Sequence, residues 1–158
     1  FQFDAIYASP MKRAQQTLAH VAANRSLTPI VLEELREVDF GSWTGLTWEE
    51  VRERFQTSPF RWLDQLEQGL ILEAEPVAGF RNRVDAGLRK ILTVGPAEAV
   101  AVVCHGGVIR MLLALLLDLP LPKMAVFEID YASVTVVQHG PSKTEVQLLN
   151  FSPWRDGA

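Results

Sequence analysis

An apolar run that stops at a histidine and two glycines places the strongest constraint on how this chain can fold. Residues 99–104 form an unbroken apolar stretch of strand length, and the residues after His105 are again largely apolar, but with a different period. A strand that is apolar on both faces is typical of the centre of a parallel sheet covered by helices. The sequence therefore predicts an α/β fold in which His105 follows a central strand, at the sheet edge where such folds bind ligands.

The other periodicities predict strands and helices that alternate along the chain. Strands are expected at residues 4–8, 30–32, 134–138 and 145–150, with the last two forming a hairpin. Helices are expected after Ser9-Pro10, after Thr47, after Ser58-Pro59, over residues 80–92 and from Gly106 onward. Thr47 and Glu50 have the spacing of a capping box, which marks a helix start. We therefore expect a single domain over residues 1–158, an α/β sandwich with a mixed sheet.

Composition and charge exclude several classes of function. The chain has 158 residues, of which 48% are hydrophobic, and this is enough for one ordinary core. Because the net charge is −4 and no Lys/Arg cluster occurs, we expect no nucleic acid partner. The longest apolar stretch is interrupted by Arg110 and is too short to span a bilayer, so we expect no membrane partner.

Cysteine usage bears on the compartment and on metals. Cys104 is the only cysteine, so no disulfide can form within the chain, and no CxxC or HExxH spacing predicts zinc. We expect a cytoplasmic protein that uses neither a metal nor another cofactor. A homodimer remains open.

Two candidate phosphate ligands follow predicted strands. Gly106 and Gly107 let a ligand approach the backbone after His105, and the free N–H groups at a helix start favour an anion, above all phosphate. The structural alternative is that His105 is a satisfied polar residue that closes a strand. Arg13 lies just inside the helix after the first strand, and its guanidinium suits bidentate contact with phosphate. Its alternative is a solvated position on a polar helix face.

Glu37 is a candidate general acid. It belongs to an acidic run, which is ordinarily a solvated loop, but the stretch EVDFGSWTG surrounds it with glycines and aromatic residues. A carboxyl held against an apolar wall has a raised pKa, and such a group can deliver a proton near neutral pH.

Three stretches, taken in order, resemble a known family. YASPMKRAQQT, LREVDFGSWTGLTWEEV and VVCHGGVIRMLL are similar to motifs of the histidine phosphatase superfamily, which has the phosphoglycerate mutase-like fold. FEIDYASVTVV and VQLLN also fit its closing hairpin, so the resemblance covers nearly the whole chain. It implies a three-layer α/β sandwich with a mixed, mostly parallel sheet.

The resemblance also implies roles for individual residues. In this family a histidine in an Arg-His-Gly motif on the first strand accepts the phosphoryl group. Arg13 matches the arginine that grips the phosphate, and Gly106 is expected to bind it as well. Glu37 matches the carboxyl that protonates the leaving oxygen and then activates water. His105 matches the second histidine, which stabilises charge on the phosphoryl oxygens.

The chain departs from the family pattern at its start. No Arg-His-Gly occurs in these residues, so we expect the first strand and the nucleophilic histidine to precede Phe1. The chain would then be an N-terminally incomplete piece, inactive as given. His20 cannot replace the nucleophile, because it lies seven residues after Arg13, about 10 Å along a helix. A second departure is EPVAGF, where relatives often carry Pro-x-Gly-Glu-Ser.

The leading hypothesis is a metal-independent phosphomonoester hydrolase that acts on a small phosphorylated metabolite through phosphohistidine. The segment from Glu37 to His105 is shorter than is usual in the glycolytic mutases, which favours the small phosphatase branch. Two alternatives are a phosphate-binding module without turnover and a phosphoglycerate mutase. An acyl hydrolase would need a Gly-x-Ser-x-Gly elbow, which the sequence lacks.

Overall fold

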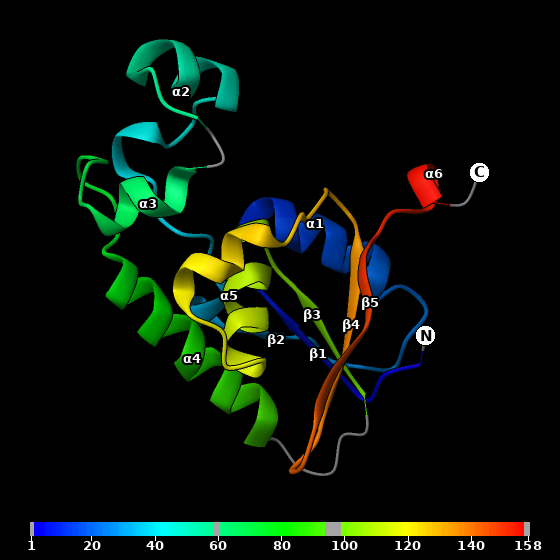
Figure 1. The fold of residues 1–158 in the computed structure, drawn as a ribbon. Helices are drawn as coiled ribbons and strands as arrows, with labels where there is room; N and C mark the ends of the chain where they lie inside the picture. The colour runs from blue at the N-terminus through cyan, green and yellow to red at the C-terminus, as the bar shows by residue number, and fades with distance from the viewer. Residues whose placement is uncertain (1, 59–60, 94–98, 157–158) are drawn as a thin grey trace.

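The computed structural model describes residues 2–58, 61–93 and 99–156 and arranges their strands in two sheets (Figure 1). Three parallel strands pair in the order β2-β1-β3, and their bounds are β1 (Ala5–Ala8), β2 (Ile30–Val31) and β3 (Val100–Val103). β4 (Val134–His139) and β5 (Thr144–Phe151) form an antiparallel hairpin. Ala8 lies opposite Val103, so β1 and β3 end at the same edge of the sheet. The residues that follow these two strands are therefore neighbours.

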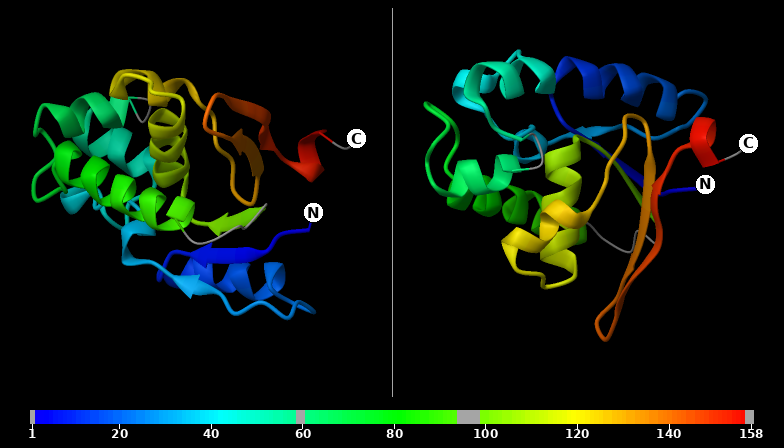
Figure 2. Two further views of the ribbon diagram at one scale, coloured as in Figure 1. Left: turned by 90° about the horizontal axis from the view of Figure 1, so that it is seen from below. Right: turned by 45° about the horizontal axis from the view of Figure 1, so that its top comes forward.

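Helices cover both faces of the parallel sheet, which gives three layers (Figure 2). The helices are α1 (Lys12–Val21), α2 (Trp48–Phe55), α3 (Trp62–Glu67), α4 (Val77–Thr93), α5 (Gly106–Leu116) and α6 (Pro153–Asp156), with 3-10 turns at η1 (Glu33–Leu35), η2 (Gly41–Trp43) and η4 (Leu121–Val126). Successive side chains of a strand point to opposite faces. Ile6 and Ala8 accordingly pack with Leu18 of α1, while Tyr7 packs into the larger core with α4 and α5.

Local sequence signals account for several helix starts. Thr47 Oγ1 accepts the amide hydrogen of Glu50 at 3.2 Å, and Glu50 Oε2 accepts that of Thr47 at 2.8 Å, so the predicted capping box of α2 is confirmed. Pro59 lies outside the described residues, and α3 begins at Trp62. In the described parts of the chain, no helix has both the length and the apolar character needed to cross a bilayer.

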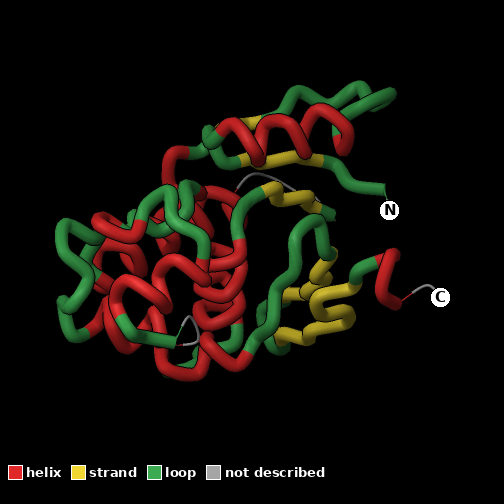
Figure 3. Tube along the Cα trace, turned by 90° about the horizontal axis from the view of Figure 1, so that it is seen from above, coloured by secondary structure: helices red, strands yellow, loops and turns green. Residues whose placement is uncertain are grey.

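The α/β sandwich and its parallel strands are confirmed, but two details of the sheet differ from expectation. β1 is the central strand, whereas β3 lies at one edge, and all four of its residues are only half-buried. Among the described residues β4 and β5 pair only with each other, so the strands form two sheets and not one mixed sheet (Figure 3). Continuous apolarity indicated that β3 is covered by helices; it carried no information on which strands flank it.

Candidate active site

Ser9 and His105 meet where β1 and β3 end. The Ser9 amide donates a 2.9 Å hydrogen bond to the Val103 carbonyl, which extends the pairing one residue beyond β1. Cys104 then leads directly into His105, the N-cap residue of α5. Ser9 is fully buried, and His105 is 6% exposed. The parallel register thus brings together two side chains that are 96 residues apart in the sequence.

Arg13 reaches the same histidine from the first turn of α1. Its Nε–H donates to Nδ1 of His105 over 3.2 Å, and the other ring nitrogen, Nε2, lies 2.7 Å from Ser9 Oγ. Because arginine only donates hydrogen bonds, Nδ1 is the acceptor and Nε2 carries the proton of the neutral ring. Ser9 Oγ also accepts the Met11 amide hydrogen at 3.3 Å. Two of the predicted site residues, Arg13 and His105, are therefore in direct contact.

The His105 ring is neutral in this arrangement. Burial, together with the positive charge of Arg13, lowers the pKa of His105 from 6.5 to about 4. A bound anion would offset the guanidinium charge and favour the imidazolium form. The neighbouring Cys104 is also uncharged, because burial raises the pKa of its thiol to about 12.

Glu37 approaches the start of α5 from the loop after η1. Its Oε2 accepts the Gly107 amide hydrogen at 3.1 Å, and its Oε1 accepts the Val38 amide hydrogen at 3.0 Å. The Glu37 amide in turn points at the Met11 sulfur, 3.4 Å away. Burial raises the pKa of Glu37, and the two backbone donors and the charges of Arg13 and Arg110 oppose this shift only in part. The pKa shift thus has the predicted direction, but the neighbours of Glu37 are backbone amides of Val38 and Gly107 and two arginines, and its role as an acid stays a prediction.

The two glycines of α5 leave room for side chains from other elements. An added Cβ at Gly107 would lie 2.5 Å from Glu37 Oε1, so this position admits the carboxylate only because it has no side chain. An added Cβ at Gly106 would lie 3.1 Å from Arg110 Nη1. Gly106 opens α5 directly after His105, and its contact with phosphate stays a prediction.

Arg110 is a second cation beside the site. Its Nε donates a 2.7 Å hydrogen bond to the Phe127 carbonyl, which ties α5 to the segment that leads into β4. Burial lowers the pKa of Arg110, and the carboxylates of Glu37 and Glu128 oppose that shift. Arg110 lies one helical turn after Gly106, so the sequence alone could have predicted that the two residues share a helix face.

Sequence reasoning also missed Ser9, although it precedes the proline of the first motif. The other two histidines lie elsewhere: His20 is exposed on α1, and His139 is exposed at the end of β4, where Nδ1 lies 2.8 Å from Thr144 Oγ1. In residues 2–58, 61–93 and 99–156, no three His, Cys, Asp or Glu side chains are placed to hold a metal ion.

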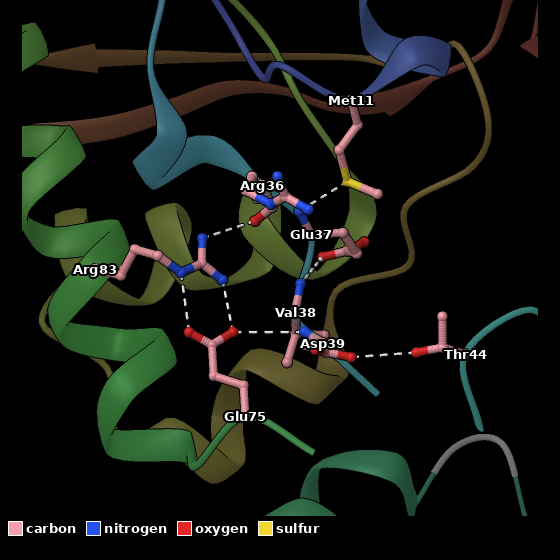
Figure 4. Close-up of a pocket in the computed structure, with 8 residues that line it drawn as sticks. All are labelled: Met11, Arg36, Glu37, Val38, Asp39, Thr44, Glu75 and Arg83. Atoms are coloured by element: carbon pink, nitrogen blue, oxygen red, sulfur yellow. Dashed lines mark hydrogen bonds and ion pairs between the residues drawn. The ribbon is translucent and has the colours of Figure 1, made fainter. Parts of the chain in front are cut away.

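A pocket of about 440 Å³ opens beside Glu37 (Figure 4), within the size range of small-molecule sites. It is lined by Met11, Arg36, Glu37, Val38, Asp39, Thr44, Glu75 and Arg83. Met11 and Glu37 link it to the Arg13–His105 contact, since Met11 also bonds Ser9 and Glu37 also bonds α5. Six of the eight lining residues are polar or charged, although apolar atoms also contribute much of the pocket surface.

Known proteins resemble this chain over nearly its whole length. The relatives include phosphoserine phosphatase 1 of Hydrogenobacter thermophilus, 30% identical over 94% of this chain and 71% of the relative. Adenosylcobalamin/alpha-ribazole phosphatase of Escherichia coli is 24% identical over 94% of this chain and 73% of the relative. A mycobacterial protein described as bifunctional is 31% identical, but the match spans only 40% of its length.

Solved structures show the same fold. A putative alpha-ribazole-5'-P phosphatase from Escherichia coli superposes with a TM-score of 0.80 at 23% identity, over 95% of this chain and 74% of that one. A mycobacterial glucosyl-3-phosphoglycerate phosphatase superposes with a TM-score of 0.77 at 24% identity, over 94% and 77% of the two chains. The sequence model of the histidine phosphatase superfamily (branch 1) matches residues 1–152. The chain therefore belongs to the histidine phosphatase superfamily and has its phosphoglycerate mutase-like α/β fold.

Proposed function

We propose that the protein is a phosphomonoester hydrolase that acts through phosphohistidine on a small phosphorylated metabolite. The observation that carries this proposal is the direct contact of Arg13 with His105 at the start of α5, where Glu37 is also bonded. These groups complement an anion and can move a proton. Relatives named as phosphatases of phosphoserine and of alpha-ribazole support a small phosphate ester as the substrate class.

Arg13, His105 and Gly106 would bind the phosphoryl group. The Arg13 guanidinium supplies a permanent charge and a planar set of donors, and it is exposed at the start of α1 where a ligand can reach it. When an anion arrives, Arg13 can exchange its bond to Nδ1 for bonds to phosphoryl oxygens. Nδ1 of His105 then gains a proton and donates to the anion, while Nε2 keeps its bond to Ser9 Oγ.

Glu37 would handle the protons of both chemical steps. In the first step the phosphorus–oxygen bond of the ester breaks as a phosphorus–nitrogen bond forms on a histidine, and the Glu37 carboxyl gives its proton to the leaving oxygen. In the second step the Glu37 carboxylate takes a proton from the water that attacks phosphorus, and phosphate leaves the histidine. Its raised pKa supports this role, because the protonated form persists at higher pH. The pocket beside it would receive the alcohol.

The histidine that accepts the phosphoryl group would come from outside these 158 residues. The sequence has three histidines and no Arg-His-Gly, and His105 is already bonded through both ring nitrogens. By itself the chain would therefore hold phosphate esters without turning them over, as in the alternative of a phosphate-binding module.

The deciding experiment compares binding with turnover. Titration calorimetry of the 158-residue chain with inorganic phosphate should give saturable binding that Arg13→Ala weakens and His139→Asn does not. The same chain should release no p-nitrophenol from p-nitrophenyl phosphate, whereas the polypeptide with its upstream histidine should release it and form an acid-labile phosphoenzyme. Absence of phosphate binding would contradict the proposed phosphate site. Arg13-dependent hydrolysis by the isolated chain would contradict the proposal that the nucleophilic histidine comes from outside these residues.

A further inference from the structure

Arg83 of α4 forms a bidentate ion pair with Glu75, which lies just before that helix (Figure 4). Arg83 Nε donates to Glu75 Oε1 at 2.9 Å, and Nη2 donates to Oε2 at 2.7 Å. Their side chains are 23% and 19% exposed. A planar pair with two parallel charge-assisted bonds fixes both distance and orientation, which a single surface ion pair does not.

The third nitrogen of the guanidinium bonds the chain just before Glu37. Arg83 Nη1 donates to the Glu34 carbonyl at 2.9 Å and to the Arg36 carbonyl at 2.8 Å. These carbonyls belong to the turn that η1 forms and to the residue that follows it. Arg83 thus anchors the polypeptide immediately on the N-terminal side of the candidate acid.

Glu75 anchors the same loop on the other side of Glu37. Its backbone amide donates to the Asp39 carbonyl at 2.9 Å, and its Oε2 lies 3.5 Å from the Asp39 amide, at the limit of a hydrogen bond. Asp39 Oδ1 then accepts the Gly41 amide hydrogen at 2.9 Å, which shapes the next turn. Residues 36 and 39 are therefore both attached to one ion pair, and Glu37 lies between the two attachments.

We propose that Arg83 and Glu75 are positioning residues for Glu37: they fix the loop so that the carboxylate stays against the Gly107 amide and next to the phosphoryl site. The proposal rests on the acid–base role assigned to Glu37 above. Both residues hold the loop through the backbone of residues 34–39, and both also line the pocket beside Glu37. A displacement of about 1 Å in a catalytic group can cost on the order of 10²-fold in rate.

The same anchoring holds the Glu37 carboxyl in its half-buried position at the edge of the pocket. The groups that influence the Glu37 charge include Arg13 on α1, Arg110 on α5 and Cys104 at the end of β3. The charged side chains that line the same pocket are Arg36, Asp39, Glu75 and Arg83. Burial is the largest influence on the Glu37 carboxyl and raises its pKa. If the loop loosens, water reaches the carboxylate and this pKa falls toward its ordinary value.

Two conservative variants test the pair. Arg83→Lys keeps the charge, but one ammonium cannot replace a fork that bonds Glu75 and two carbonyls. Glu75→Gln keeps the shape and removes the charge. The matched control is Arg89→Lys, because Arg89 pairs with Asp85 on the same helix but is 77% exposed and contacts no part of the Glu37 loop in the described residues. Circular dichroism and thermal unfolding establish which variants are folded.

The first readout needs no turnover. Heteronuclear NMR of the isolated chain, with labelled glutamate carboxyls, follows the titration of Glu37. We expect Arg83→Lys and Glu75→Gln to lower the Glu37 pKa and Arg89→Lys to leave it unchanged. Folded variants with an unchanged Glu37 titration would overturn the proposal, and so would an equal shift in Arg89→Lys.

The second readout uses the polypeptide with its upstream histidine. Arg83→Lys should lower kcat by about 10²-fold, because Glu37 is displaced in the transition state. Arg83 also lines the pocket proposed for the alcohol, so KM is expected to change as well and kcat is the deciding quantity. An unchanged kcat in a folded Arg83→Lys protein would overturn the proposal. If Glu37 shifts as expected but the wild-type protein hydrolyses nothing, the positioning is supported and the phosphatase function fails, so the two failures are distinguishable.

Discussion

Glu37 and Gly107 fit together without spare room: the Gly107 amide donates a 3.1 Å hydrogen bond to Glu37 Oε2, and a β-carbon on Gly107 would lie 2.5 Å from Oε1. The first turn of α5 therefore binds the Glu37 carboxylate in a closely fitted position. Gly106, the neighbouring residue of that turn, follows His105 directly, so Glu37 is bonded to α5 within two residues of His105.

Gly107→Ala should displace the Glu37 carboxylate from the first turn of α5. Overpacking of this kind costs about 1–3 kcal/mol in the free energy of unfolding, and turnover should fall with it. Chemical denaturation of the variant measures the first effect. Gly79→Ala is the control, since an added Cβ there meets its nearest atom at 3.9 Å and alanine favours the helix. Equal stability of the Gly107 and Gly79 variants would contradict the clash.

The tautomer of His105 is a second prediction. Because Arg13 Nε donates to Nδ1, the neutral ring should carry its proton on Nε2 at pH near 7, and long-range nitrogen–proton NMR spectra report this directly. Ser9→Ala removes the acceptor of that proton and should cost about 1–3 kcal/mol, because it leaves a buried donor unpaired. An Nδ1–H tautomer in the wild-type chain would rule out the hydrogen bond as described.

Acid should destabilise the fold partly through His105. Its pKa is about 4 in the folded chain and 6.5 in the reference state, so the unfolded chain binds the proton first as pH falls. The contribution is fully present above pH 6.5 and is lost progressively between 6.5 and about 4. The slope from one group is at most about 1.4 kcal/mol per pH unit. The free energy of unfolding, measured by chemical denaturation at several pH values in this range, should depend less on pH for His105→Gln than for the wild type. An equal pH dependence of the two proteins would contradict a depressed pKa of His105.

Arg13→Lys should weaken the binding of inorganic phosphate by about 10-fold, because an ammonium cannot reproduce the bidentate fork. Calorimetry at fixed ionic strength measures the change. Lys12→Gln removes a cation from the adjacent, exposed position and should have a much smaller effect. If both variants weaken binding equally, the attraction is general electrostatics and not a specific contact.

Much of the fold was predictable because hydrophobic periodicity and capping residues act locally. The strand at residues 5–8, the capping box of Thr47 and the helix after His105 all follow from short stretches of sequence. The order of the strands depends on contacts between distant parts of the chain. An apolar run has the same sequence pattern at the centre of a sheet as at its edge. The position of β3 beside β1 therefore needed the structure.

The candidate site was likewise predictable from the sequence only in part. Arg13, Glu37 and His105 stand in recognisable motifs, and the structure brings Arg13 to His105 and Glu37 to the start of α5. Glu75 and Arg83 look like ordinary charges at a helix start and on a helix surface. They hold residues 34–39 through hydrogen bonds to backbone carbonyls. The positions of backbone carbonyls cannot be predicted from a pattern of side chains, so this role was not predictable from the sequence.

The pairing of β1 with β3 also determines when the site forms during folding. Arg13 and Ser9 contact a histidine that is 92 and 96 residues away along the chain. Contacts of such long range require a large loop to close, so they depend on the rest of the fold being in place. A nascent or partly folded chain therefore lacks the contacts of Arg13 and Ser9 with His105. If this contact binds phosphate as proposed, the anion should bind the native state only, and phosphate should stabilise the folded chain against unfolding.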